Sequence, residues 1–150
     1  MMNEKNVKLE DVFPIIAEKL SSGGEVTFGP KGTSMLPLIV QGKDRVTLTA
    51  AHGRLKKYDL PLYRRENGQF VLHRVVAVNK DGTYTMCGDN QYIREYGITD
   101  SRIIGVVKII NHGGEEISVS DIRYKCYCRF IVAYRRLRRM ASVIKHRIIK

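Results

Sequence analysis

Residues 32–37 read Gly-Thr-Ser-Met-Leu-Pro, a short apolar turn that holds a single serine, Ser34. Gly32 can adopt a positive φ or let the backbone approach another segment closely. Pro37 fixes its own φ and stiffens the exit from the turn. Such a turn can project a hydroxyl, and we interpret Ser34 as a nucleophile. A free serine is a weak nucleophile at neutral pH, so this interpretation requires a base and a group that orients the base.

His73 is the candidate base, within the segment Leu-His-Arg-Val at 72–75. A neutral imidazole with an ordinary pKa near 6.5 can accept a serine proton at pH 7, and activity should then fall as the pH drops below that pKa. Asp100, ahead of an apolar strand, could hold the imidazole in the correct tautomer. Asp89, in Gly-Asp-Asn at 88–90, is an equally plausible candidate from the residues alone.

Each of these residues also has an ordinary structural interpretation. A serine between glycine and proline is usually a turn residue, and an aspartate ahead of a strand usually caps a turn. A lone strand histidine is more often half-buried than catalytic. The catalytic interpretation therefore depends on the set of segments and not on any one residue.

The elements that must position these side chains are mostly β-strands. Periodicity predicts a helix over 9–20 and strands over 25–28, 45–49, 60–64, 69–78, 83–87 and 102–110. Pro61 should place its strand at a sheet edge or make it irregular. Asn67-Gly68 and the run at 80–82 predict hairpin turns, and 88–101 is a polar loop. His73 falls in the second arm of the first hairpin.

The last 30 residues differ in kind from the rest. Apolar side chains recur at helical spacing, and most basic ones fall off that stripe, which predicts a basic amphipathic helix. The stripe consists of Phe130, Tyr134, Leu137, Ala141, Ile144 and Ile148. The fold class is therefore mainly β, with a short N-terminal helix and a basic C-terminal helix. We divide the chain into a domain over 1–120 and a helical tail over 121–150.

Five segments resemble, in order, the boxes of the type I signal peptidases and LexA-like repressors. They are residues 32–37, 41–44 (Gln-Gly-Lys-Asp), 57–64 (Lys-Tyr-Asp-Leu-Pro-Leu-Tyr-Arg), 71–76 (Val-Leu-His-Arg-Val-Val), and 88–90 together with 100–105 (Asp-Ser-Arg-Ile-Ile-Gly). The His-Arg pair resembles the endoplasmic-reticulum and archaeal type of enzyme, in which histidine stands where the main bacterial type has lysine. The resemblance covers about residues 25–110.

The resemblance implies a LexA/signal-peptidase-like β fold and peptide-bond hydrolysis through an acyl-enzyme. By similarity Ser34 is the nucleophile, His73 the base and Asp100 the third member, with Asp89 supporting the site. Gly32 stands where many signal peptidases have a serine that completes the oxyanion hole. The Ser34 N–H, together with the Thr33 hydroxyl, would then have to stabilise the oxyanion. The family's N-terminal membrane anchor and the repressors' DNA-binding domain have no counterpart here.

Composition limits the remaining possibilities. Of the net charge of +11, residues 121–150 hold +9, with ten Lys and Arg against one Asp.

Three cysteines are too few for a disulfide framework and favour a reducing, cytoplasmic compartment. The first 20 residues are too charged for a secretory signal, and no apolar run is long enough to span a bilayer. Cys126 and Cys128 lack zinc-ligand spacing, and we expect no metal or cofactor.

The sequence therefore predicts a serine endopeptidase that trims a leader or precursor peptide. A basic amphipathic tail can lie on an anionic membrane surface, dock onto a membrane-bound partner or follow nucleic-acid phosphates. The first two are favoured, because the tail offers no aromatic platform for stacking bases. The competing hypothesis is a non-catalytic signal-peptidase-like module that binds a peptide or tethers to a surface.

Overall fold

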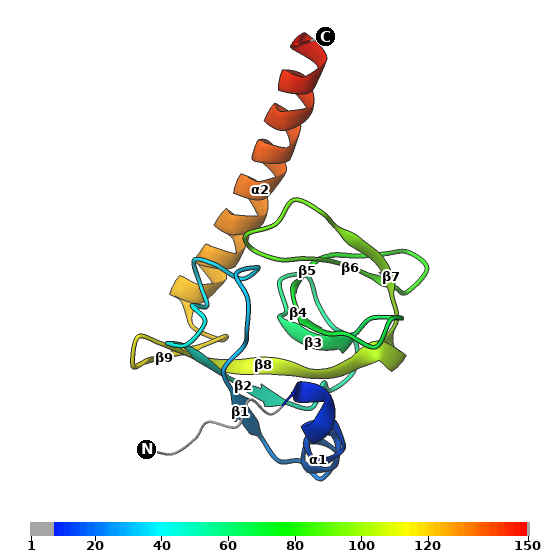
Figure 1. Ribbon diagram of the computed structural model, residues 1–150, viewed down its shortest axis with the longest axis vertical. Helices are drawn as coiled ribbons and strands as arrows, with labels where there is room; N and C mark the ends of the chain where they lie inside the picture. Colours follow the sequence, from blue (N-terminus) through cyan, green and yellow to red (C-terminus); the bar gives the residue numbers. More distant parts are fainter. Residues whose placement is uncertain (1–7, 150) are drawn as a thin grey trace.

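The computed structural model describes residues 8–149 and is built around two antiparallel sheets (Figure 1). Helix α1 (Leu9–Ser21) precedes the sheets, and helix α2 (Ile122–Ile148) follows them. Within residues 8–149 the strands are β1 (Val26–Phe28), β2 (Arg45–Thr49), β3 (Pro61–Arg64), β4 (Phe70–Leu72), β5 (Arg74–Val78), β6 (Tyr84–Cys87), β7 (Glu95–Ile98), β8 (Ile103–His112) and β9 (Glu115–Ser118). The predicted fold class, mainly β with one helix at each end, is confirmed.

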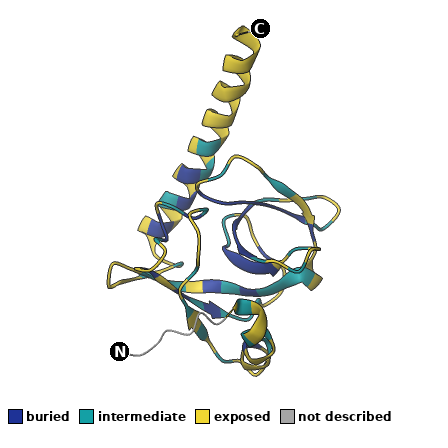
Figure 2. Cartoon of the chain, in the orientation of Figure 1, coloured by how far each residue is buried: buried dark blue, intermediate teal, exposed yellow. Residues whose placement is uncertain are grey.

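The larger sheet runs in the order β1-β2-β8-β3-β4, with β9 added on β8, and the smaller sheet is β5-β6-β7. The long strand β8 is central to the larger sheet, because it pairs with β2, β3 and β9 along its length. The described residues form two apolar clusters. One includes Leu48, Leu62 and Ile110 of the larger sheet. The other joins the two sheets, because it combines Tyr63 and Val71 of the larger sheet with Val75, Tyr84 and Met86 of the smaller one. Buried strands thus form the body of the molecule (Figure 2).

The predicted strand over 69–78 is wrong in one respect that matters for function. The chain leaves the larger sheet after β4 and enters the smaller sheet at β5, and His73 is the single residue between them. A β-strand that continued through position 73 would keep both halves in one sheet. The change of sheet fixes His73 at the junction of the two sheets, where both constrain its backbone.

Two other sequence predictions, for Pro61 and for residues 88–101, are only partly correct. Pro61 is not at a sheet edge, because β3 lies between β8 and β4, but the pairing with β8 is irregular between Leu62 and Tyr63. Residues 88–101 are not all loop, because they include β7, which pairs with β6. Its pattern, Glu-Tyr-Gly-Ile, has too few apolar residues to predict a strand, and pairing with β6 supplies the order that its own side chains do not.

Helix α2 has a docked half and a free half. Tyr124, Cys128 and Ile131 are its buried residues, and every described residue from 136 onwards is exposed. The free half extends away from the sheets (Figure 1). Across residues 8–149, no helix combines the length and the apolar character that crossing a bilayer requires.

Candidate active site

Ser34 lies in a turn between β1 and β2, as the sequence predicts. Gly32 has a φ of +92°, in the left-handed region that favours glycine. Its N–H donates to the Gln41 side-chain oxygen at 2.7 Å, which closes the loop around the turn. Ser34 is half-buried, whereas Met35 next to it is buried and packs in the core of the larger sheet. Met35 therefore fixes the turn on the body of the protein while Ser34 remains partly accessible.

His73 is 2% exposed, and its two ring nitrogens face different groups. Nδ1 lies 3.3 Å from the Tyr63 hydroxyl and 3.5 Å from a Glu95 carboxylate oxygen. Nε2 faces the opposite way, towards Gly88. The imidazole thus has one nitrogen directed at a carboxylate and the other left for a different partner.

The group that faces Nε2 of His73 is the turn holding Ser34, on the other side of Gly88. A Cβ placed on Gly88 would lie 3.2 Å from His73 Nε2 and 2.7 Å from the carbonyl oxygen of Ser34. These two atoms can therefore be no further apart than the sum of the two distances. Ser34 and His73 also line one pocket of about 190 Å³. Residues 39 positions apart in the sequence are thus brought together, with Nε2 on the Ser34 side of the ring.

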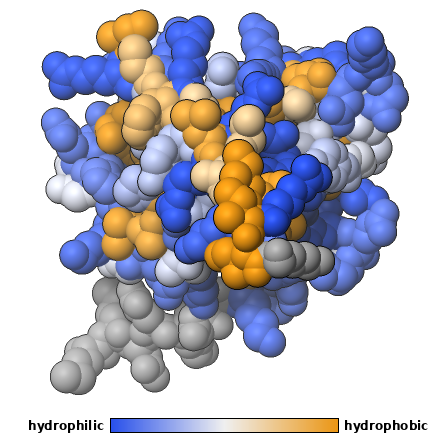
Figure 3. Space-filling model, turned by 90° about the horizontal axis from the view of Figure 1, so that it is seen from above, coloured by the Kyte–Doolittle hydropathy of each residue, from blue (hydrophilic) through white to orange (hydrophobic). Residues whose placement is uncertain are grey.

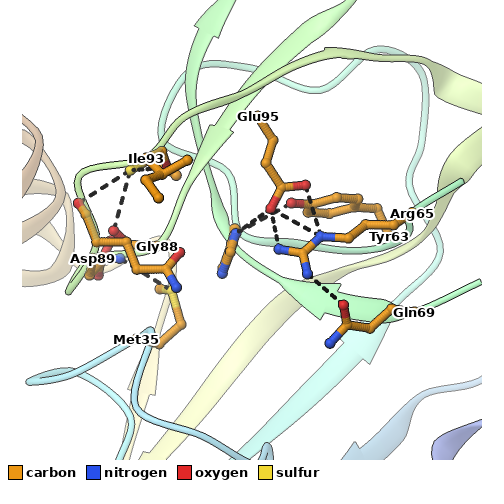
Figure 4. Close-up of polar contacts among 11 residues, drawn as sticks. Met35, Tyr63, Arg65, Gln69, Gly88, Asp89, Ile93 and Glu95 are labelled. Atoms are coloured by element: carbon orange, nitrogen blue, oxygen red, sulfur yellow. Dashed lines mark hydrogen bonds and ion pairs between the residues drawn. The ribbon is translucent and has the colours of Figure 1, made fainter. Parts of the chain in front are cut away.

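Glu95, on β7, is the carboxylate that reaches His73. It accepts hydrogen bonds from Arg65 Nε at 3.0 and 3.1 Å and a further one from Arg65 Nη2. Figure 4 shows the Glu95 carboxylate directed towards Arg65 and Tyr63, with Gln69 on the far side of the guanidinium. Glu95 is thereby held by the arginine, and its pKa is lowered because hydrogen bonds and charge from Arg65 outweigh the opposing effect of burial.

Burial controls the charge of the imidazole. It lowers the pKa of His73 to about 4, because desolvation disfavours the imidazolium more than the neighbouring Glu95 carboxylate favours it. The Arg65 guanidinium also lowers this pKa, since a second cation close by repels the imidazolium. His73 is therefore neutral at pH 7, the state in which Nε2 can accept a proton.

Asp89 is buried but committed to another partner. Its two oxygens accept hydrogen bonds from Nε and Nη2 of Arg74, each at 2.7 Å, and one also accepts from Tyr127 at 2.9 Å. Its backbone N–H points at the Met35 sulfur, 3.5 Å away. Asp89 therefore supports the site by fixing the loop after β6 against Met35, and not by contacting the imidazole.

Asp100, the residue predicted to orient His73, lies in a 3₁₀ turn (Asp100–Arg102) and contacts other groups. Its carboxylate accepts a hydrogen bond from the Tyr84 hydroxyl at 2.6 Å and lies 3.6 Å from Arg54. It lines a separate cavity of about 800 Å³ that does not include Ser34 or His73. The structure thus places Ser34 and His73 around one pocket and Glu95 beside the imidazole, and leaves Asp100 outside that group.

The donors available to an oxyanion beside Ser34 are one backbone N–H and one side-chain hydroxyl. In the described chain the Ser34 N–H has no hydrogen-bond acceptor, and neither does the Thr33 hydroxyl. The Thr33 carbonyl accepts from the Asn90 side chain at 3.1 Å, which orders the peptide just before Ser34. A serine at position 32 would be strained at that residue's left-handed φ, so the side-chain donor of the signal peptidases does not fit this turn without cost.

Sequence reasoning missed Glu95 for a specific reason. Register between distant strands places Glu95 opposite Met86, and nothing local to residues 88–101 reveals that pairing. The sequence feature that could have pointed to Glu95 is that it is a lone glutamate close after Gly-Asp-Asn. Among residues 8–149 no three His, Cys, Asp or Glu side chains gather closely enough to hold a metal ion.

Comparisons with protein-family models, with curated proteins and with solved structures gave no match to this chain.

Proposed function

We propose that this chain is a serine endopeptidase that uses Ser34 as nucleophile and His73 as base, with Glu95 rather than Asp100 orienting the imidazole. One observation carries the proposal. Nε2 of His73 and the backbone of Ser34 meet across Gly88, while Nδ1 faces a carboxylate. That is the order of groups that serine acyl transfer needs, independent of the fold that supplies them.

The reaction follows from those positions. Nε2 takes the proton of the Ser34 hydroxyl as the oxygen attacks the carbonyl carbon of the substrate, and Glu95 holds the N–H at Nδ1. The peptide C–N bond then breaks, and the imidazolium gives its proton to the leaving amine. Water, deprotonated by the same nitrogen, hydrolyses the serine ester and releases the acid. The N–H of Ser34 is the donor best placed to stabilise the oxyanion.

A leader or precursor peptide is the substrate class that we propose. The pocket shared by Ser34 and His73 has room for small side chains only, at about 190 Å³. This agrees with cleavage after small residues in an extended strand, which the resemblance implies. We propose the cytoplasm as the place of action, because Cys87, Cys126 and Cys128 are all free thiols, with α2 at a membrane surface.

A serine-reactive fluorophosphonate probe tests the catalytic proposal. We expect labelling at Ser34, complete loss in Ser34→Ala, and a fall of about 100-fold or more in labelling rate in His73→Asn. Ser101→Ala is the matched control, since Ser101 is an exposed serine in the turn that holds Asp100. Circular dichroism should show the same fold for all four proteins.

One observation favours a second candidate, a module that binds peptides without cleaving them. Within residues 8–149 no hydrogen bond joins the Ser34 hydroxyl to His73. Labelling that is absent from the parent chain, or equal in His73→Asn, would contradict the peptidase. Binding of an extended peptide by the unlabelled protein would then support the module.

A further inference from the structure

Helix α2 has large apolar side chains, in its free half and on the uncovered side of its docked half, that the body of the protein does not cover. Phe130, Leu137 and Ile148 are 64%, 65% and 76% exposed. Tyr134 and Ile144 are exposed too, and Phe130 stacks on Tyr134 with ring centroids 5.8 Å apart. Isolated apolar residues on a surface are ordinary, but a continuous apolar stripe marks an interaction site.

This apolar stripe does not face the body. With 3.6 residues per turn, its centre lies about 130° round the helix axis from the docked side, which carries Tyr124, Cys128 and Ile131. Viewed from above, a band of hydrophobic side chains runs between hydrophilic ones (Figure 3). Packing within this chain therefore leaves the stripe without a partner among the described residues.

The charges on α2 have one sign. The helix carries nine Lys and Arg and no Asp or Glu. In the free half the basic residues Arg136, Arg139 and Lys145 lie on the sides and back of the stripe. An apolar face bordered by cations matches the boundary between the acyl chains and the headgroups of an anionic bilayer.

We propose that α2 docks the protein on an anionic membrane surface, with the stripe of Phe130, Tyr134, Leu137, Ile144 and Ile148 facing the acyl chains. The helix lies on the surface and does not cross it, since its basic side chains occupy most of its circumference. This inference goes beyond the peptidase proposal and does not depend on catalysis.

The same observations disfavour two other occupants. A second copy would set nine cations against nine cations, with no acid on either helix to compensate. Nucleic acid would pair with the arginines but would leave the apolar stripe in water. In the experiment below, a second copy predicts self-association, and a nucleic-acid site predicts binding that depends on charge alone.

The test uses the full chain carrying Ser34→Ala, so that binding and cleavage cannot be confused. We measure flotation with vesicles of phosphatidylcholine alone and of phosphatidylcholine with phosphatidylglycerol. We expect binding to the anionic vesicles only, weakened by added salt. Leu137→Asp with Ile144→Asp should reduce that binding about tenfold or more, because both carboxylates interrupt the stripe.

Ser142→Asp with His146→Asp is the matched control, since it adds the same two carboxylates on the opposite, polar face of the helix. It should retain more binding than the stripe variant. Equal losses in the two variants would overturn the proposal, because the binding would then depend on charge alone. Failure to bind anionic vesicles would also overturn it, as would self-association in sedimentation that only the stripe variant abolishes.

Discussion

His73 is a residue whose burial determines its protonation state. The sheets remove it from water, and the Arg65 guanidinium close to it opposes a positive charge on the ring. Glu95 opposes both effects but does not overcome them. The neutral base is consequently stable over a wider pH range than an exposed histidine would allow.

We predict that catalysis persists well below neutral pH. The ordinary pKa of histidine would place the loss of activity near pH 6.5, but a pKa of about 4 moves the acid limb of kcat/KM to about pH 4. The sign follows from the base itself, which works only when unprotonated. Rates of probe labelling measured from neutral pH down to about pH 3 give this limb directly.

Glu95→Gln provides the comparison. Removing the negative charge beside the ring lowers the pKa of His73 further, so the acid limb should move to lower pH while the plateau rate falls. Asp100→Asn should leave both unchanged, since Asp100 contacts Tyr84 and Arg54. A limb near pH 6.5 in the parent chain would contradict the role of burial.

Residue type and order were enough to single out Ser34 and His73 as candidates, but not the carboxylate that lies beside the imidazole. A serine in a Gly/Pro turn and a histidine beside an arginine can be recognised from residue type and order. The third member depends on which carboxylate the tertiary fold brings to Nδ1, and Glu95 reaches it from a strand that local pattern did not predict. The choice between Asp89 and Asp100 therefore omitted Glu95, the carboxylate that lies 3.5 Å from Nδ1.

Among the elements, the loop after β6 and the turn that holds Ser34 are hydrogen-bonded to each other. The Asn90 N–H donates to the Ser34 carbonyl at 2.8 Å, and its side chain donates to the Thr33 carbonyl. On the other side, Arg135 of α2 donates to the Asn90 side-chain oxygen at 3.2 Å. The position of the nucleophile thus depends on a loop that α2 contacts directly.

Gly88→Ala tests this connection between the loop and the turn. The added methyl would meet backbone, the Ser34 carbonyl, at 2.7 Å, and His73 Nε2 at 3.2 Å, so the turn and the ring must move apart. We predict a loss of about 100-fold in kcat/KM with a destabilisation of about 1–3 kcal/mol. Probe labelling and urea unfolding measure the two effects.

Gly29→Ala is its control. A methyl there would make an ordinary 3.6 Å contact with the Asp44 carbonyl, and labelling should stay within about twofold of the parent. An unaffected Gly88→Ala would mean that Ser34 and His73 do not need their present separation.

The order of the elements was largely predictable because hairpin turns and apolar alternation are local signals. The change of sheet at His73 was not, because leaving one sheet for another is decided by pairing between strands that are distant in the sequence. The pattern of residues 69–78 predicts one strand even though the two halves pair in different sheets.

Over the whole molecule, Arg74 joins parts that would otherwise be separate. It is fully buried on β5 and donates to Asp89, to the Tyr58 carbonyl, and to Tyr124 and Cys128 of α2. The smaller sheet, the loop after β6 and the docked half of α2 therefore meet at one guanidinium. Its pKa is raised well above the usual value, since the bonds to Asp89 outweigh the cost of desolvation.

We predict that Arg74→Met destabilises the protein by about 3–5 kcal/mol, because Asp89 would remain as an uncompensated buried charge. Asp89→Asn should cost a similar amount, since it leaves the guanidinium unpaired. Urea unfolding followed by circular dichroism measures both.

Arg102→Gln is the control at the surface. Its partner Glu66 is largely exposed, and loss of that pair should cost about 1 kcal/mol or less. Equal effects at Arg74 and Arg102 would show that the buried pair does not hold the parts together.

The uneven distribution of charge was visible in the sequence, and it set apart the last 30 residues, where the structure has helix α2. It could not show that α2 begins as part of the core, because helical periodicity gives the faces of a helix and not the neighbours that cover them. Tyr124 and Cys128 belong to the docked side, and the apolar stripe that periodicity identified is the one left uncovered.

Helix α2 continues without a break from Tyr124 in the core to Ile148, so a single rigid rod carries both the contact with Asn90 and the exposed stripe. The 13 exposed helical residues over 136–148 measure about 20 Å at 1.5 Å per residue, and a helix that lies on the surface would extend that far along it. If that rod is held by lipid, the reactive hydroxyl works at a constant height above the bilayer. The enzyme would then act as a ruler, and it would select a scissile bond by its distance from the membrane as well as by its side chains.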